Sequence, residues 1–158
     1  MNSRSLGSSR HPLLRDRDRV SHSLGYTLLT NEIASLVEAT GFDPFIGFLH
    51  GLRYGRQSLS LDLVEEFRHP VIDGLVLTLT NKGSVRETDF NQQDSGAFML
   101  SKPAFGHFVE LYENRMEREF EEKEAGSQTS YRKLIRRHVE MMQNVVLNKG
   151  EYQPFLVQ

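Results

Sequence analysis

The chain has 158 residues, which is enough for one domain with a sizeable core but short for two. Its net charge is −2 with 25% charged residues, so no overall positive field points to nucleic acid and any anion-binding site must be local. The absence of cysteine excludes disulfides, thiolate metal ligands and cysteine nucleophiles, and it favours a reducing, cytoplasmic setting. No apolar run approaches the ~20 residues that span a bilayer, so no contact with a membrane is expected.

The N-terminal segment differs in composition from the rest of the chain. Residues 1–19 are rich in serine, arginine and aspartate and offer little to bury, which predicts a disordered or unplaced leader before a folded domain over 20–158. From Val20 onward, apolar residues recur at helical spacing and predict a helix over about 20–40. Gly41 lies where a glycine that ends a helix is expected.

A second long helix is expected to begin at Ser58, whose hydroxyl can cap it, and to run to about residue 79. Its apolar positions are three or four residues apart, and they place Leu63 in the core. Pro70 lies inside this pattern and predicts a kink or break, because proline has no amide hydrogen to donate to the helix.

The second half of the chain adds shorter elements. Residues 96–100 read as a short strand or an extended linker, and a third helix starts at Pro103 with Phe105 and Phe108 on its apolar side. The last helix is expected over about 130–148. The sequence therefore predicts an all-α single domain of about four to six helices.

Four polar residues are candidates for a chemical site: Glu32, His50, Asp62 and Glu65. Asp62 and Glu65 are three apart, so on a helix both carboxylates lie at neighbouring positions of one face. Glu32 lies among apolar neighbours, where a carboxylate is costly to bury without a cation or a hydrogen-bond donor. Carboxylates with one imidazole suit Mg²⁺ or Mn²⁺ better than zinc. Such a centre can polarise a phosphodiester, which makes phosphate chemistry the natural inference.

Cations near these residues could bind phosphate. Arg53, Arg56 and Arg68 lie beside the candidate site in sequence and could form paired hydrogen bonds to phosphate oxygens. A basic stripe at helical spacing on the last helix could contact DNA, and it consists of Arg132, Lys133, Arg136 and Arg137.

A structural interpretation of each feature also fits the sequence. Two acids three apart are more often a solvated helix face, or a pair with a neighbouring cation such as Arg68. A lone histidine such as His50 is more often structural, and a basic stripe is more often an exposed helix face. Spacing alone leaves both interpretations open.

Three motifs in a fixed order resemble a known family. The segments "TNEI", "GFDPFIGFLH" and "SLDLVEEFR", at their separations here, are similar to the catalytic domain of the CRISPR-associated integrase, the endonuclease that inserts spacers into CRISPR arrays. The resemblance runs from about Val20 to the end and takes in "TDF", "YRKLIRRHVEMM" and "YQPF". It implies a helical domain in which Glu32, His50 and Glu65 bind the catalytic metal, with Asp62 as a second acid and Arg68 facing DNA.

The resemblance also implies a reaction and partners. A DNA 3′-hydroxyl would attack a phosphodiester at the repeat boundary while Mg²⁺ or Mn²⁺ stabilises charge, and water in its place would cut the DNA. The substrates implied are protospacer DNA, the CRISPR repeat and branched DNA, and the partners are a second copy and a small ferredoxin-like adaptor protein. The family also has an N-terminal β domain, for which a chain of this length has no room, so a truncated form is expected.

Two other functions are compatible with the sequence. The first is a non-catalytic helical module of the same family that binds DNA or a protein, and it would bind without metal through the cations of the last helix. The second is an unrelated metal phosphohydrolase that acts on small phosphoesters and has no activity on branched DNA.

Overall fold

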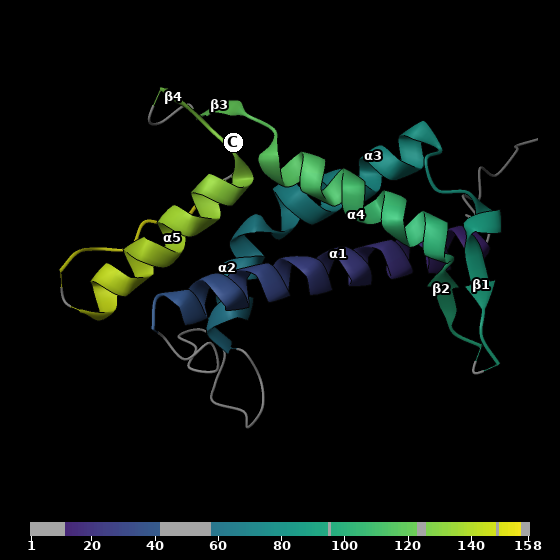
Figure 1. Cartoon of the computed structure of the whole chain (residues 1–158), viewed down its shortest axis with the longest axis horizontal. Helices are drawn as coiled ribbons and strands as arrows, with labels where there is room; N and C mark the ends of the chain where they lie inside the picture. Colours follow the sequence, from purple (N-terminus) through teal and green to yellow (C-terminus); the bar gives the residue numbers. More distant parts are fainter. Residues whose placement is uncertain (1–11, 42–57, 95, 123–125, 148, 156–158) are drawn as a thin grey trace, which may run out of the picture.

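The structure is a computed structural model, and it describes residues 12–41, 58–94, 96–122, 126–147 and 149–155 (Figure 1). It is mostly helical with two small antiparallel strand pairs, which confirms the predicted all-α class. Among the helices described, none is both long and apolar enough to cross a membrane.

The longest helix, α1, spans Pro12–Ala39 and lies along the domain, with the other helices packed against it (Figure 1). It begins within residues 1–19, the segment that the sequence left without a fold. A proline suits the first turn of a helix, and arginine and leucine extend an existing helix at little cost even where nothing is buried. The predicted end is confirmed, because Gly41 has a φ of +81° and its amide donates to the carbonyl of Glu38 at 2.9 Å.

The second helical segment is continuous but distorted in the middle. It consists of α2 (Ser58–Phe67), the π-helical η1 (Arg68–Asp73) and α3 (Gly74–Lys82). The distortion coincides with Pro70 and confirms the predicted kink. Arg115, from a later helix, donates its Nε hydrogen to the carbonyl of Pro70 at 2.8 Å and so links the distorted turn to its neighbour.

Two hairpins flank the fourth helix, α4 (Lys102–Glu117). Before it, the turn η2 (Glu87–Asp89) leads into β1 (Phe90–Gln92), which pairs with β2 (Phe98–Leu100). The strand predicted over 96–100 is therefore present as β2.

After α4, β3 (Phe120–Glu122) pairs with β4 (Ser127–Thr129). The last helix, α5 (Tyr131–Val146), follows directly, and the hydroxyl of Ser130 accepts a hydrogen bond from the amide of Lys133 at 3.4 Å. The sequence did not indicate this second hairpin, because strands of three residues are too short to show an alternating pattern.

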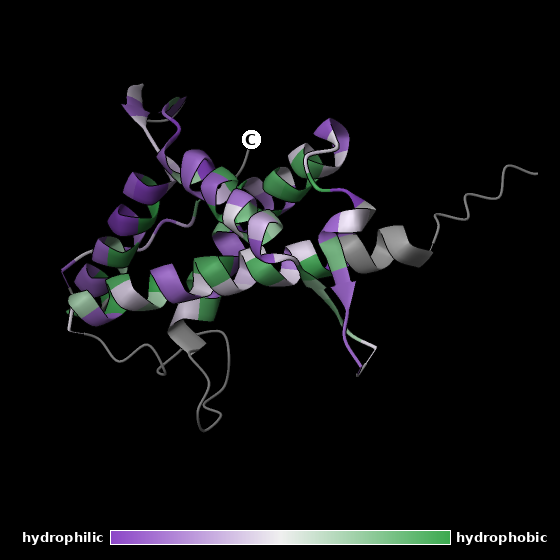
Figure 2. Ribbon diagram, turned by 45° about the vertical axis from the view of Figure 1, so that its right-hand side comes forward, coloured by the Kyte–Doolittle hydropathy of each residue, from purple (hydrophilic) through white to green (hydrophobic). Residues whose placement is uncertain are grey.

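The core lies where α1, the segment from α2 to α3, α4 and α5 meet, and Figure 2 shows hydrophobic and hydrophilic residues mixed along each of these helices. Leu63 is 1% exposed and Phe108 is fully buried, as predicted. Phe105 was expected beside Phe108 but is 45% exposed. It lies in the first turn of α4, where it lines a surface pocket with β2 and does not reach the helical core. Met141 and Met142 of the last helix are only partly buried.

Candidate functional site

The candidate acids lie on two helices that pack against each other. Glu32 lies in α1, and Asp62 and Glu65 lie in α2. His50, Arg53 and Arg56 fall outside the described residues, so their predicted roles stay predictions.

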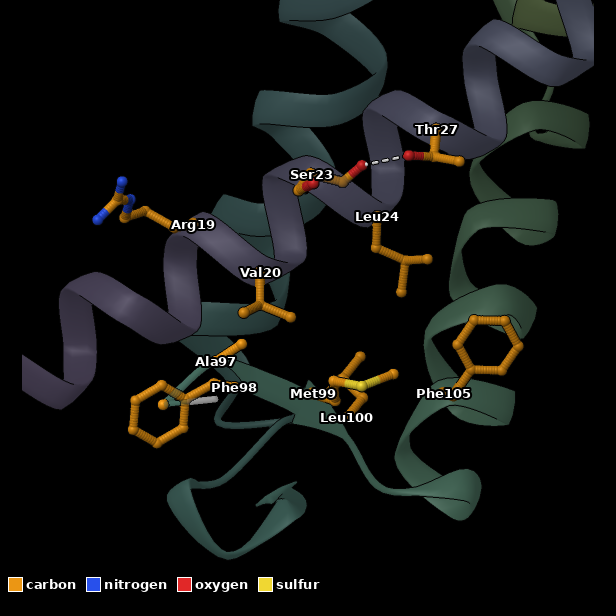
Figure 3. A pocket seen from close by; sticks show the side chains of 11 residues that line it. Arg19, Val20, Ser23, Leu24, Thr27, Ala97, Phe98, Met99, Leu100 and Phe105 are labelled. Atoms are coloured by element: carbon orange, nitrogen blue, oxygen red, sulfur yellow. Dashed lines mark hydrogen bonds between the residues drawn. The ribbon is translucent and has the colours of Figure 1, made fainter. Parts of the chain in front are cut away.

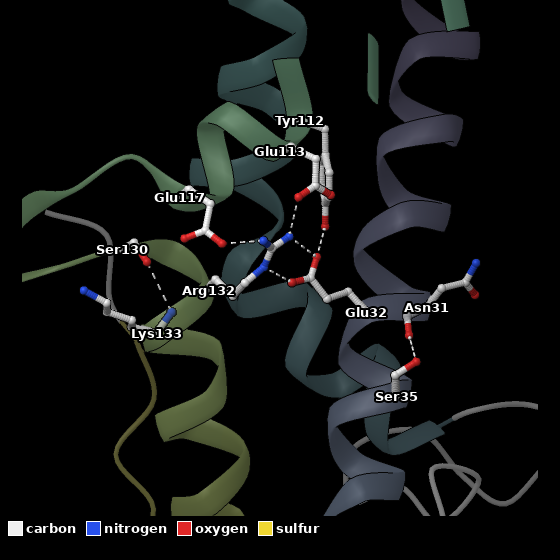
Figure 4. A network of polar contacts seen from close by, with 9 residues as sticks. All are labelled: Asn31, Glu32, Ser35, Tyr112, Glu113, Glu117, Ser130, Arg132 and Lys133. Carbon is white, nitrogen blue, oxygen red and sulfur yellow. Dashed lines mark hydrogen bonds and ion pairs between the residues drawn. The ribbon is translucent and has the colours of Figure 1, made fainter. Parts of the chain in front are cut away.

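Glu32 points from α1 toward α4 and α5 (Figure 4). Its Oε2 accepts a hydrogen bond from the hydroxyl of Tyr112 at 2.9 Å, and its Oε1 accepts one from Nε of Arg132 at 2.5 Å. The side chain is only 20% exposed. The sequence had indicated that a carboxylate at this position needs a cation or a donor, and the structure supplies both.

Arg132 also binds two carboxylates of α4 (Figure 4). Its Nη2 lies 2.9 Å from Glu113 and its Nη1 lies 2.5 Å from Glu117. Three carboxylates from two helices therefore surround one guanidinium group of α5. Their hydrogen bonds, with that of Glu32 first, raise the pKa of Arg132. Burial, together with the charge of Glu32, raises the pKa of the Tyr112 hydroxyl, which keeps it a hydrogen-bond donor.

The residues that surround Glu32 were not among the predicted site residues, apart from Arg132. Glu113 and Glu117 are four apart on one helix, which is a spacing that places them on the same face. That signal is weak, and nothing in the sequence indicates that this face meets Arg132 of α5.

Asp62 and Glu65 lie in different environments, although they are three residues apart. Asp62 is 5% exposed, whereas the side chain of Glu65 is 48% exposed. Glu65 accepts a hydrogen bond from the hydroxyl of Tyr26 on α1 at 3.3 Å, and Nε of Arg68 lies 3.5 Å from its carboxylate. The pair with Arg68 is one of the structural interpretations that the sequence left open. Both groups are exposed, so the pair contributes less than about 1 kcal/mol.

The two candidate ligands on α1 and α2 have separate partners in this structure. Glu32 follows Tyr26 by six positions, about 9 Å along the axis of α1. Within the described residues, no three histidine, cysteine, aspartate or glutamate side chains form a group that could hold a metal ion. The candidate ligands still suit Mg²⁺ or Mn²⁺ chemically, because most of them are carboxylates. Glu32 already binds a positive group in this structure, the guanidinium of Arg132.

The basic stripe on α5 is largely paired with acids. Besides Arg132, Lys133 binds Glu119 at 3.0 Å and Arg137 binds Glu122. Arg136 is exposed and forms no ion pair with a carboxylate in the described ranges. The pair of Lys133 with Glu119 is exposed on both sides, so it is weak and can be exchanged for a phosphate contact.

Two pockets open on the surface near α1. One, of about 740 Å³, is largely apolar and lies between α1, β2 and the start of α4, lined among others by Leu24, Met99 and Phe105 (Figure 3). None of the candidate acids lines it. A smaller pocket of about 370 Å³ is lined by Tyr26 and Arg68, both of which contact Glu65, so it lies beside the candidate site.

Next to Glu65 on α2, Glu66 binds the C-terminal segment. It accepts hydrogen bonds from the hydroxyl of Tyr152 at 2.5 Å and from the amide of Phe155 at 2.9 Å, and Nδ1 of His138 lies 3.4 Å away. Burial acts to raise the pKa of Glu66, but hydrogen bonds from His138, Tyr152 and Phe155 outweigh it, and the pKa is lowered. The ring of Phe155 stacks on Phe67 with centroids 5.3 Å apart. These contacts fix α2 against α5.

The mostly helical fold agrees with the helical domain that the resemblance implied. Residues 10–114 match the family model described as CRISPR associated protein Cas1, and the chain belongs to this family.

The chain is similar to longer members of the family. It is 37% identical over 136 residues to the CRISPR-associated endonuclease Cas1 3 of Thermus thermophilus, an alignment that covers 85% of this chain and 41% of the relative. A Cas1 protein of Thermotoga maritima has a similar structure, with a TM-score of 0.77 at 29% identity over 85% of this chain and 41% of that one.

A third similar protein is a casposase bound to an integration product. Its TM-score is 0.79 at 25% identity, over 87% of this chain and 40% of the casposase. The chain therefore spans about two fifths of the length of each of these three proteins.

Proposed function

We propose that this chain is the helical part of a metal-dependent DNA integrase and endonuclease that acts in CRISPR adaptation. In this proposal Glu32, His50 and Glu65 bind Mg²⁺ or Mn²⁺, with Asp62 as a second acid beside them. The observation that carries the proposal is the placing of Glu32 and Glu65 on two packed helices of a chain related to proteins named endonucleases. Further support comes from the likeness to a casposase bound to an integration product.

The residues of this chain would position the reacting groups. A metal ion, when bound, supplies charge stabilisation for an in-line displacement at a phosphodiester. Tyr26 holds the carboxylate of Glu65 through its hydroxyl, 3.3 Å away. Arg68 lines the pocket beside Glu65 and can turn from that carboxylate to a phosphate oxygen, since both side chains are about half exposed.

The proposed substrates are protospacer DNA, the CRISPR repeat and branched DNA. A second copy of the chain and a small ferredoxin-like adaptor protein are the proposed protein partners, and the cytoplasm is the proposed setting. Phosphate contacts are proposed for the cations close in sequence to the candidate acids of α2 and for those of α5, namely Arg53, Arg56, Arg68, Arg132, Lys133, Arg136 and Arg137.

The test is a reaction with a branched DNA that mimics a half-integrated spacer, with and without Mn²⁺. We expect metal-dependent strand rejoining or cleavage by the wild type, and its loss in His50→Ala and Glu32→Gln. These two variants, purified identically, also control for contaminating nucleases. Lys82→Gln, at an exposed lysine of α3 that is assigned no phosphate contact, is the matched control and should retain activity. Activity that persists in EDTA or in Glu32→Gln would contradict the proposal.

A second candidate function is DNA binding without catalysis, and it is favoured by the ion pair between Glu32 and Arg132. With Glu32 committed to Arg132, the domain would bind DNA through its exposed cations alone. Binding would then be unchanged by EDTA and would weaken steeply with salt, because phosphate contacts release counterions. Fluorescence anisotropy with labelled branched DNA in EDTA, alongside the strand-joining reaction, separates the two functions.

A further inference from the structure

We propose that Arg132 is an internal counter-ion of Glu32, and that a divalent metal binds Glu32 only by displacing it. The inference rests on the proposed function, because it concerns the same carboxylate. It adds that a residue of α5 regulates the metal affinity of the site.

Both oxygens of Glu32 are engaged in the structure. Arg132 Nε lies 2.5 Å from Oε1, and the Tyr112 hydroxyl lies 2.9 Å from Oε2. A metal ion bonded to a carboxylate oxygen lies about 2–2.6 Å from it, which is the space that Arg132 Nε now occupies at Oε1. Two cations at that distance from one oxygen would also repel each other strongly. The guanidinium group must therefore move before the metal binds there.

Two other carboxylates can hold the guanidinium group of Arg132 after it leaves Glu32. Its Nη2 already binds Glu113 and its Nη1 already binds Glu117, both on α4. A small shift away from α1 would break the Nε contact with Oε1 of Glu32 and the longer Nη2 contact with Oε2, at 3.4 Å, and would keep the two contacts with α4. Tyr112 needs no such shift, because its hydroxyl binds the other oxygen and can hold Glu32 in place whether the metal is bound or not.

The exposure of the outer partners favours a withdrawal of Arg132 away from α1. Glu113 and Glu117 are 50% and 60% exposed, so water reaches the outer side of the guanidinium group, whereas Glu32 is 20% exposed on its inner side. Water can therefore solvate Arg132 as it withdraws outward. Removal of the arginine should strengthen metal binding, whereas removal of its outer partners should weaken it.

The experiment measures Mn²⁺ binding to the full chain by electron paramagnetic resonance of free Mn²⁺, with thermal unfolding as a second readout. Arg132→Gln should bind Mn²⁺ about tenfold more tightly than the wild type, since it loses one competing charge-assisted hydrogen bond. Its unfolding temperature should rise more on addition of Mn²⁺. Lys133→Gln removes the same charge from the next residue, which binds Glu119, and should change the affinity little. In Arg132→Gln combined with Glu32→Gln, the gain should disappear.

A second variant tests the same inference where Arg132→Gln fails to fold. In the double variant Glu113→Gln and Glu117→Gln, Glu32 is the one carboxylate of this cluster left to Arg132. The arginine should then compete more strongly for Glu32, so Mn²⁺ should bind more weakly. Glu119→Gln with Glu121→Gln is the matched control, because it removes the same charge from exposed acids outside the cluster.

The outcomes separate the inference from the proposed function. If the wild type binds Mn²⁺ through Glu32 and Arg132→Gln binds it no more tightly than Lys133→Gln does, the displacement is wrong while the metal site stands. If no variant binds Mn²⁺, the proposed metal site fails and the inference fails with it.

Discussion

The carboxylate of Glu66 on α2 accepts a hydrogen bond from the hydroxyl of Tyr152, 2.5 Å away, near the C-terminal end of the described chain. Phe155 adds its amide to the same carboxylate and stacks its ring on Phe67. Glu65, a candidate metal ligand, is the residue before Glu66. The C-terminal segment therefore helps to fix the helix on which the proposed site depends.

Loss of the Tyr152 hydroxyl should destabilise the domain. Tyr152→Phe keeps the ring and removes the hydrogen bond to the partly buried carboxylate, which is worth about 1.5–3 kcal/mol of unfolding free energy. It also removes the weaker contact of the hydroxyl with Nδ1 of His138, 3.3 Å away. Urea denaturation monitored by circular dichroism measures the change. Tyr131→Phe is the control, because its hydroxyl has no hydrogen-bond partner among the described residues, and it should change stability by less than about 0.5 kcal/mol. Equal effects of the two variants would argue against a specific role for the Tyr152 contact.

The same carboxylate should make stability depend on pH at the acid end. The pKa of Glu66 in the folded state is below its ordinary value of 4.5. Its contribution is therefore complete above that value, where the carboxylate is ionised in both states, and is lost as the pH falls through the lowered pKa. Unfolding free energy should fall between about pH 5 and 3 in the wild type. Glu66→Gln should be less stable at neutral pH and show a shallower fall over that range, and identical slopes would contradict the assignment.

Leu63 and Leu77 provide a matched pair of leucines for the packing of the second helical segment. Leu63 is 1% exposed in α2, and Leu77 is 62% exposed in α3. Leu63→Ala should cost about 2–5 kcal/mol through lost burial and the cavity left behind. Leu77→Ala should change stability by about 0.5 kcal/mol or less. Chemical denaturation of both variants compares them, and a small loss for Leu63→Ala would mean that the core around α2 is loosely packed.

Features that depend on neighbours in the sequence were predictable, and features that depend on distant pairs were not. The glycine end of α1 at Gly41 and the kink at Pro70 follow from the backbone properties of single residues, and the structure has both. The partners of Glu32 lie 80 and 100 positions away, at Tyr112 and Arg132. No local pattern indicates that these residues meet, although the need of Glu32 for a cation was clear from its apolar surroundings.

Periodicity also failed at the ends of elements. Phe105 and Phe108 have the spacing of one apolar helix face, yet only Phe108 lies deep enough along α4 to meet the other helices. The apolar pattern of one helix does not indicate over which of its turns the neighbouring helices pack. For the same reason, Asp62 and Glu65 share a face by spacing but differ in burial, because the boundary of the packed surface passes between them.

Tyr26 provides a test of the candidate site that leaves its proposed ligands intact. Its hydroxyl donates to Glu65 at 3.3 Å from the neighbouring helix α1. Tyr26→Phe removes this donor from an exposed carboxylate, so the unfolding free energy should change by less than about 1 kcal/mol. If Glu65 binds metal, a loosely held carboxylate should raise the Mn²⁺ concentration needed for half-maximal strand joining by several-fold. Activity at saturating Mn²⁺ should stay near that of the wild type, because the metal then orders Glu65 itself.

Thr27→Ala is the control, because Thr27 is the next residue and lines the same small pocket as Tyr26. It should leave the Mn²⁺ requirement unchanged. A Tyr26→Phe enzyme with an unaltered Mn²⁺ requirement would place Glu65 outside the metal site.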